Sequence, residues 1–136
     1  MDEFTREVAL LKEMGLKYNP LRLEYEEKVR ALSAMSEALK AEGYSEEHIA
    51  KALHEERREL GRLFKEAAPP LFRQYIYAAT AAEYGDPLGP TFEMLRKRKS
   101  CKQIIESASR PIKNLDNRLT LSGFRQWYLT SYTKET

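Results

Sequence analysis

The sequence predicts an all-α fold, and three observations support this prediction. Apolar residues recur at three- and four-residue spacing along most of the 136-residue chain, which is the period of an amphipathic helix. The segments with this spacing are bounded by capping residues and by glycine or proline. No run of residues has the alternating pattern of a strand, and no internal repeat is found. We therefore expect one helical domain spanning residues 1–136.

A first helix and the first arm of a long helical hairpin are expected in the N-terminal third. The apolar spacing predicts a helix over residues 2–14, ended by Gly15. A second helix is predicted over residues 20–42, because Pro20 suits the first helical position, where its missing N–H costs nothing. Gly43 is expected to end this helix in the left-handed conformation that glycine adopts easily.

The second arm of the hairpin has the best-defined start. Ser45 is an N-cap candidate, and Glu46 and Glu47 place negative charge at the positive end of the helix dipole. This helix is predicted to end at Pro69 and Pro70. Two helices of this length joined by so short a turn must lie antiparallel. The first helix and the hairpin together account for residues 1–68.

Shorter helices and a loop rich in glycine and proline are expected in residues 69–136. A fourth helix is predicted over residues 70–84, and two short helices follow the caps Thr91 and Ser100. The last helix is predicted near residues 122–132. This C-terminal part is expected to carry the functional site.

Charge is distributed unevenly along the chain. Residues 91–136 contain ten Lys or Arg against four Asp or Glu, whereas residues 1–90 contain 13 against 17. Four cations are consecutive, from Arg96 to Lys99, and Arg110 follows them. A basic segment of this kind is typical of a surface that binds a polyanion such as nucleic acid, and also of a solvated helix face.

Ionisable side chains are expected in the middle of the long third helix. At 100° per residue, Glu56 falls inside the apolar stripe of this helix, and Lys28 falls at the equivalent place on the second helix. A buried ion pair between Lys28 and Glu56 is the structural interpretation, and a general-base carboxylate is the functional one. His54 is expected toward the polar side, as a solvated histidine or as a proton carrier.

The segment YGDPLGPTFEMLR, residues 84–96, interrupts the helical pattern. Asp86 lies between a glycine and a proline, where it can shape a turn. The segment is interpreted either as a rigid connector or as part of a site. In the second interpretation, the first turn of the helix after Thr91 holds a phosphate together with the side chains of Arg96 and Lys99.

Several kinds of site are excluded by the composition. Cys101 is the only cysteine, so the chain has no internal disulfide and no thiolate-rich zinc site. His48 and His54 point in different directions on one helix, so they cannot share a metal ion. The longest apolar runs are far short of the roughly 20 residues that span a bilayer, and the acidic N-terminus lacks the pattern of a signal peptide. We therefore predict no metal-binding residues, no cofactor and no membrane partner; Asp and Glu could bind magnesium, but no spacing in the sequence specifies such a site.

Three segments resemble a known family. RRELGRLFKEAAPPLFRQYIY, YGDPLGPTFEMLR and IIESASRP lie in this order over about residues 57–111, and they resemble the C-terminal effector domains of bacterial polymorphic toxins of the contact-dependent inhibition and Rhs types. KRKSCKQ stands where similar segments have a lysine-glycine turn before the IIE helix. The resemblance implies a domain delivered as part of a larger bacterial protein, toxicity in the target-cell cytoplasm and a cognate immunity protein. It does not define the reaction, because such domains have many activities.

Two functional hypotheses follow. The first is an antibacterial effector that cleaves RNA or DNA, a reaction that needs proton-transfer groups and cations around a phosphate. The second is a non-enzymatic helical interaction module, such as an adaptor, an immunity protein or an inhibitor, because no catalytic motif is complete. The candidate catalytic residues are Asp86, Tyr84, Glu56 and His54, and the candidate substrate-binding residues are Arg96, Lys99, Thr91, Arg110 and Tyr77.

Overall fold

The computed structural model describes residues 2–15, 20–84, 91–110 and 119–132, with the backbone alone for 80–84. Every regular element in these ranges is a helix, as the sequence predicts. Within the same ranges, none of the helices combines the length and apolar character that crossing a membrane requires. The elements are α1 (Glu3–Glu13), α2 (Pro20–Arg30), α3 (Leu32–Ala41), α4 (Glu46–Ala67), α5 (Pro70–Tyr84), α6 (Phe92–Arg96), α7 (Cys101–Ala108), α9 (Leu121–Trp127) and the π-helical turn η2 (Tyr128–Tyr132).

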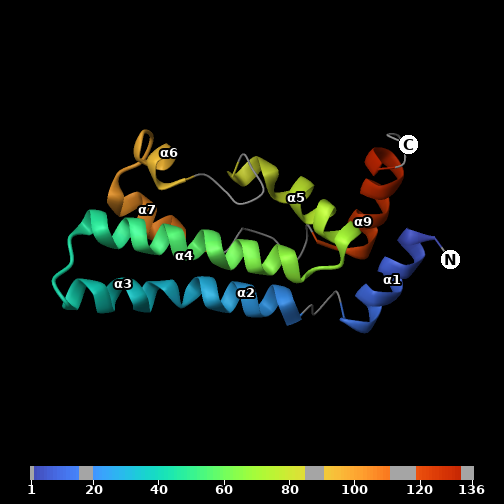
Figure 1. The fold of residues 1–136 in the computed structure, drawn as a ribbon, viewed down its shortest axis with the longest axis horizontal. Helices are drawn as coiled ribbons and strands as arrows, with labels where there is room; N and C mark the ends of the chain where they lie inside the picture. Colours follow the sequence, from blue (N-terminus) through green and yellow to red (C-terminus); the bar gives the residue numbers. More distant parts are fainter. Residues whose placement is uncertain (1, 16–19, 85–90, 111–118, 133–136) are drawn as a thin grey trace.

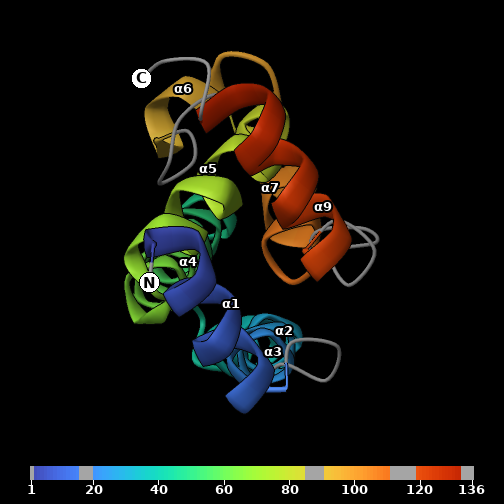
Figure 2. The ribbon, with the colours of Figure 1, turned by 90° about the vertical axis from the view of Figure 1, so that its right-hand side faces the viewer.

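The long helix α4 lies at the centre of the fold. α2 and α3 lie end to end along one side of it and run in the opposite direction, and α5, α6 and α7 lie on its other side (Figure 1). α1 packs on α5, and α9 packs on α5 as well. The view from the end shows α4 between the layer formed by α2 and α3 and the layer above it (Figure 2). α4 therefore has neighbours on both sides.

The single helix predicted over residues 20–42 is divided into two. Ala31 separates α2 from α3, although its backbone stays in the right-handed helical region, with φ −65° and ψ −14°. The hydroxyl of Ser33 donates a hydrogen bond to the carbonyl oxygen of Arg30 at 3.0 Å. Serine hydroxyls compete in this way with the backbone for helical carbonyl groups. The division is therefore a local irregularity in one helical segment.

The turn between α3 and α4 is defined by backbone hydrogen bonds. Gly43 has φ +86°, its N–H donates to Lys40, and the N–H of Tyr44 donates to Leu39. These bonds form a Schellman motif, which satisfies carbonyl groups at the end of a helix. The Ser45 side chain then accepts the N–H of His48 and begins α4, as predicted.

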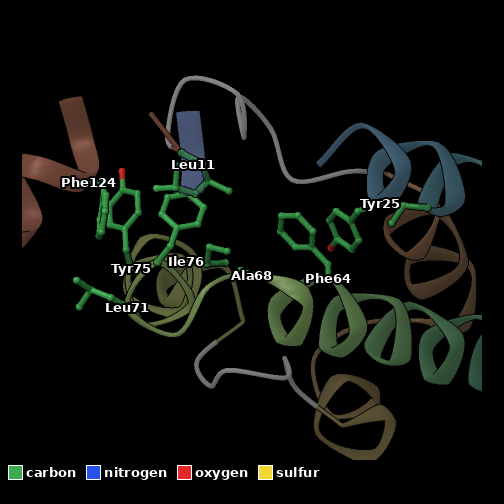
Figure 3. Packing of buried hydrophobic residues seen from close by; sticks show 11 residues of the cluster. Leu11, Tyr25, Phe64, Ala68, Leu71, Tyr75, Ile76 and Phe124 are labelled. Atoms are coloured by element: carbon green, nitrogen blue, oxygen red, sulfur yellow. The ribbon is translucent and has the colours of Figure 1, made fainter. Parts of the chain in front are cut away.

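The largest hydrophobic cluster lies where α1, α2, α4, α5 and α9 meet. Figure 3 shows Leu11 of α1 and Phe124 of α9 beside the residues of α5, with the rings of Tyr25 and Phe64 in the same cluster nearer α2 and α4. Those two rings are stacked, with centroids 4.6 Å apart. This cluster fixes one end of the molecule.

The last predicted helix, 122–132, has two parts. α9 begins after Thr120, whose hydroxyl accepts the N–H of Gly123 at 2.9 Å, and it ends at Trp127. The chain continues as the π-helical turn η2. The ring of Tyr128 in this turn contacts the ring of Phe4 in α1, with centroids 4.6 Å apart.

A second group of contacts holds α6 and α7 on the N-terminal half of α4. Phe92 and Leu95 of α6 are buried in one cluster with Ala50 of α4 and Ile104 of α7. α7 begins with the predicted capping box, in which the side chains of Ser100 and Gln103 each accept the other's backbone N–H. The position of the basic segment relative to α4 depends on these contacts.

The carboxylate of Glu7 in α1 is buried at the start of α5. It lies at the backbone N–H groups of Leu71 and Phe72, where the preceding Pro69 offers no side-chain oxygen as a cap. Burial raises the pKa of Glu7 above the ordinary value of 4.5, and it outweighs the opposite effect of the two N–H groups. Its Oε2 atom has no hydrogen-bond partner among the described atoms. The ionised form is therefore less favourable in the folded protein than in the unfolded chain.

We expect Glu7→Gln to be more stable than the wild type at neutral pH, because the neutral amide avoids the desolvation of a buried charge that raises the pKa of Glu7. Because the folded-state pKa is raised, the cost of ionisation is present above that pKa and disappears as the pH falls toward 4.5. The advantage of the variant should therefore shrink in acid. Urea denaturation of both proteins at several pH values measures it. Glu13→Gln removes a charge from an exposed position of α1 and should show no comparable trend.

Candidate functional site

The four consecutive cations are displayed together on the surface. We call Arg96 to Lys99 the basic turn; it joins the end of α6 to α7, and all four side chains are exposed. The N–H groups of Arg98 and Lys99 both donate to the carbonyl oxygen of Leu95, at 2.9 and 2.8 Å. The guanidinium of Arg96 donates to the carbonyl oxygen of Lys99 at 3.0 Å. These three hydrogen bonds hold the backbone of the basic turn in one conformation.

A pocket of about 640 Å³ lies between the first turns of α4 and α6. We call it the first pocket. Its two helical sides contribute an imidazole, two carboxylates and two cations, mostly from exposed side chains. The residues that line it are Ser45, Glu47, His48, Lys51, Phe92, Glu93 and Arg96.

Each side of the first pocket has the same arrangement of chemistry. On α4, His48 precedes Lys51 by three residues, and on α6, Glu93 precedes Arg96 by three. Residues three apart on a helix are neighbours on one face. α4 therefore brings the imidazole of His48, the carboxylate of Glu47 and one cation to the pocket, and α6 brings one carboxylate and one cation. Thr91 begins α6 by accepting the N–H of Met94 at 3.2 Å, so it helps to set the direction of this second side.

The imidazole of His48 is oriented by an aromatic neighbour. The ring of Tyr44 lies against it, with centroids 4.5 Å apart and an interplanar angle of 14°. Both side chains are exposed. The stack limits the rotation of the imidazole at the N-terminus of α4 and leaves the imidazole accessible to solvent.

A second pocket, of about 530 Å³, lies between α3, the start of α4 and α7. Three glutamates and two lysines are among its lining residues, and it contains no imidazole. The first pocket therefore offers the richer set of groups for proton transfer at a phosphate.

The structure brings together part of the predicted substrate-binding set. Thr91, Arg96 and Lys99 lie in or beside α6, and Arg96 lines the first pocket. Arg110 is exposed beyond the end of α7. Tyr77 is half-buried in α5, where the ammonium group of Lys65 lies 5.2 Å from the centre of its ring.

The predicted burial of Glu56 and its predicted ion pair with Lys28 were wrong. Glu56 is exposed on α4, and Lys28 is also exposed and pairs with Glu24 at 2.9 Å within its own helix. The expected buried ion pair between Lys28 and Glu56 is therefore absent. Arg57, the next residue along α4, is buried instead of Glu56.

The predicted position of His54, toward the polar side of the helix, was wrong as well. Only 4% of His54 is exposed, although a position toward the polar side was expected. The physical reason is that α4 packs against helices on two sides, which buries polar side chains beyond the apolar stripe. A buried histidine is poorly placed to meet a macromolecular substrate.

Two predicted catalytic residues are not tested. Asp86 lies outside the described residues, together with the rest of the glycine- and proline-rich segment 85–90. Tyr84 is the last residue of α5, and its backbone alone is described. Their proposed roles stay predictions.

Four ionisable residues of the first pocket were not predicted from the sequence. Glu47, His48, Lys51 and Glu93 were not among the candidates. Their three- and four-residue spacings are visible in the sequence, but the packing of α6 on the start of α4 is not. In the described part of the chain, no three His, Cys, Asp or Glu side chains are grouped closely enough to hold a metal ion.

No protein-family model, curated protein or solved structure matches this chain.

Proposed function

We propose that this chain is an antibacterial effector domain that binds nucleic acid and cleaves its phosphodiester backbone. The observation that supports this function best is the first pocket, in which His48 lies with Lys51 and Arg96 at the edge of the basic turn. Cleavage of a phosphodiester requires proton transfer and stabilisation of negative charge at one phosphate. The side chains in the first pocket are of the types that perform both tasks.

The cations have two distinct roles in this proposal. Lys51 and Arg96 bind the phosphate that is cleaved, and a guanidinium also suits the oxygen atoms of a phosphate through paired hydrogen bonds. The exposed Lys97, Arg98 and Lys99 bind neighbouring phosphates and align the strand across the pocket. Arg110, exposed beyond the other end of α7, binds a phosphate farther along the strand in this proposal.

The biological setting is proposed from the resemblance to polymorphic-toxin effector domains. In this setting the domain is delivered as part of a larger bacterial protein and acts in the cytoplasm of the target cell. A cognate immunity protein neutralises it by covering the surface around the first pocket.

Inducible expression in bacteria tests the proposal. Wild-type protein is expected to arrest growth, and the purified chain to degrade RNA or DNA. Lys51→Gln combined with Arg96→Gln should restore growth and lower the cleavage rate by about 10²- to 10³-fold. The matched control is Lys12→Gln, an exposed cation in α1 at the opposite end of the molecule (Figure 1), which should stay toxic.

The comparison requires that the variants fold. Circular dichroism and the amount of soluble protein are therefore measured for each of them. Normal growth of cells that accumulate folded wild-type protein would contradict the proposal. That result would leave the non-enzymatic helical interaction module as the remaining hypothesis.

A further inference from the structure

We infer that the substrate is RNA, and that the chain cleaves it by using the 2′-hydroxyl of the substrate as the nucleophile. This inference rests on the proposed function and names the substrate class of the first pocket. His48 of α4 and Glu93 of α6 carry the two proton transfers, and Lys51 and Arg96 hold the phosphate between them.

The first pocket contains the kinds of group that this reaction needs. Imidazole both accepts and donates protons near neutral pH, and a carboxylate accepts them. One group of each kind, flanked by cations, provides a general acid, a general base and charge stabilisation in one place. This set is sufficient for transfer of a phosphoryl group to a hydroxyl already present in the substrate.

The arrangement of the two sides favours this reaction. In displacement at phosphorus, the attacking and leaving oxygen atoms lie roughly in line, on opposite sides of the phosphorus. His48 lies on the α4 side of the first pocket, and Glu93 lies on the α6 side. A phosphate held between the two helices therefore has His48 on one side and Glu93 on the other. Each is followed three residues later by a cation, Lys51 or Arg96, on the same helical face.

The chemical step balances without a further reactant. Glu93 accepts the proton of the 2′-hydroxyl, and the lone pair of the 2′-oxygen forms a bond to phosphorus. The bond between phosphorus and the 5′-oxygen breaks, its electron pair stays on the 5′-oxygen, and His48 donates a proton to that oxygen. The products are a 2′,3′-cyclic phosphate and a 5′-hydroxyl. Nothing is oxidised or reduced, and DNA cannot undergo this step because it has no 2′-hydroxyl.

The stack on Tyr44 gives His48 a defined position for this role. The ring of Tyr44 covers one face of the imidazole, with 4.5 Å between centroids, and neither side chain is buried. Tyr44 is thus a positioning residue, whereas His48 contacts the leaving oxygen. Ser45 fixes the backbone N–H of His48 through its cap, which also limits the movement of the first turn.

The test uses the purified full chain and a labelled single-stranded RNA, compared with the same oligonucleotide carrying one 2′-deoxy nucleotide. We expect cleavage of the RNA to a 2′,3′-cyclic phosphate, and no cleavage at the 2′-deoxy position. His48→Gln and Glu93→Gln should each lower the rate by about 10²- to 10⁴-fold. Each should also remove one limb of the pH dependence of the rate. Glu55→Gln, at an exposed position of α4 outside the pocket, should leave rate and pH profile unchanged.

The outcomes separate this inference from the proposed function. Equal cleavage at the 2′-deoxy position, cleavage of DNA, or loss of activity on chelation of divalent cations would overturn the inference and leave the nuclease function intact. Unchanged kinetics of folded His48→Gln would overturn it as well. If neither RNA nor DNA is cleaved, and expression is harmless, the proposed function itself fails.

Discussion

Replacing Phe124 with alanine is expected to lower the free energy of unfolding by about 3–5 kcal/mol. Phe124 is fully buried where α9 meets α5 and α1. Its ring centroid lies 5.4 Å from that of Phe72, in an edge-to-face arrangement, and 5.3 Å from that of Phe4. The substitution removes these contacts and leaves a cavity that neighbouring helices fill only in part. Urea denaturation followed by circular dichroism measures the loss.

Leu129→Ala is the matched control for this prediction. Leu129 is 54% exposed in η2, close to Phe124 in the chain, so its truncation should change the free energy of unfolding by no more than about 0.5 kcal/mol. A small effect of Phe124→Ala, comparable to that of the control, would show that the C-terminal helices contribute little to the stability of the core.

The helix boundaries were the part of the fold that local chemistry predicted well. Ser45, Thr91 and Ser100 each accept a backbone N–H three residues later, and each begins a helix at the expected place. Gly43 ends a helix with positive φ, also as expected. Such features depend on a few neighbouring residues, so they can be inferred from the sequence without knowledge of distant contacts.

The buried face of α4 could not be inferred in the same way. A single amphipathic stripe is the pattern of a helix with solvent on one side. α4 has helices on two sides, so Arg57 and Lys65 are buried, while Leu63 is 49% exposed. The long stems of these cations pack as apolar groups, and their charged ends lie near aromatic rings. Because the sequence does not show which helix covers which face, Glu56 was placed in the core instead of Arg57.

Only part of the candidate site could be predicted, because the rest of it depends on the packing of two distant helices. Arg96 and Lys99 stood out because consecutive cations are conspicuous in a sequence. His48 was discounted because no metal-binding partner lies at helical spacing from it. Its neighbours across the first pocket come from α6, more than 40 residues later, and the packing that joins them is tertiary. A site formed by two helices that are this far apart in the sequence can be inferred only when the contact between the helices is known.

Tyr25→Phe is expected to destabilise the protein by about 1.5–3 kcal/mol, although it removes a single oxygen atom. The hydroxyl of Tyr25 accepts a hydrogen bond from the guanidinium of Arg57, and both residues are buried. The ring itself, which stacks on Phe64 and lies 5.3 Å from the guanidinium carbon of Arg57, stays in place in the variant. The loss therefore reports the cost of removing an acceptor from a buried charge.

A double-mutant cycle identifies the source of this energy. Arg57→Met keeps much of the apolar stem and removes the charge, so Tyr25→Phe should cost much less in that background than in the wild type. Tyr44→Phe, at a tyrosine that is 46% exposed, is the control and should change the free energy of unfolding by about 0.5 kcal/mol or less. Additive effects of Tyr25→Phe and Arg57→Met would contradict the coupling. Strong coupling would mean that α2 and α4 are held together by a charge-assisted contact between Arg57 and Tyr25, in place of the ion pair between Lys28 and Glu56 that the sequence predicts.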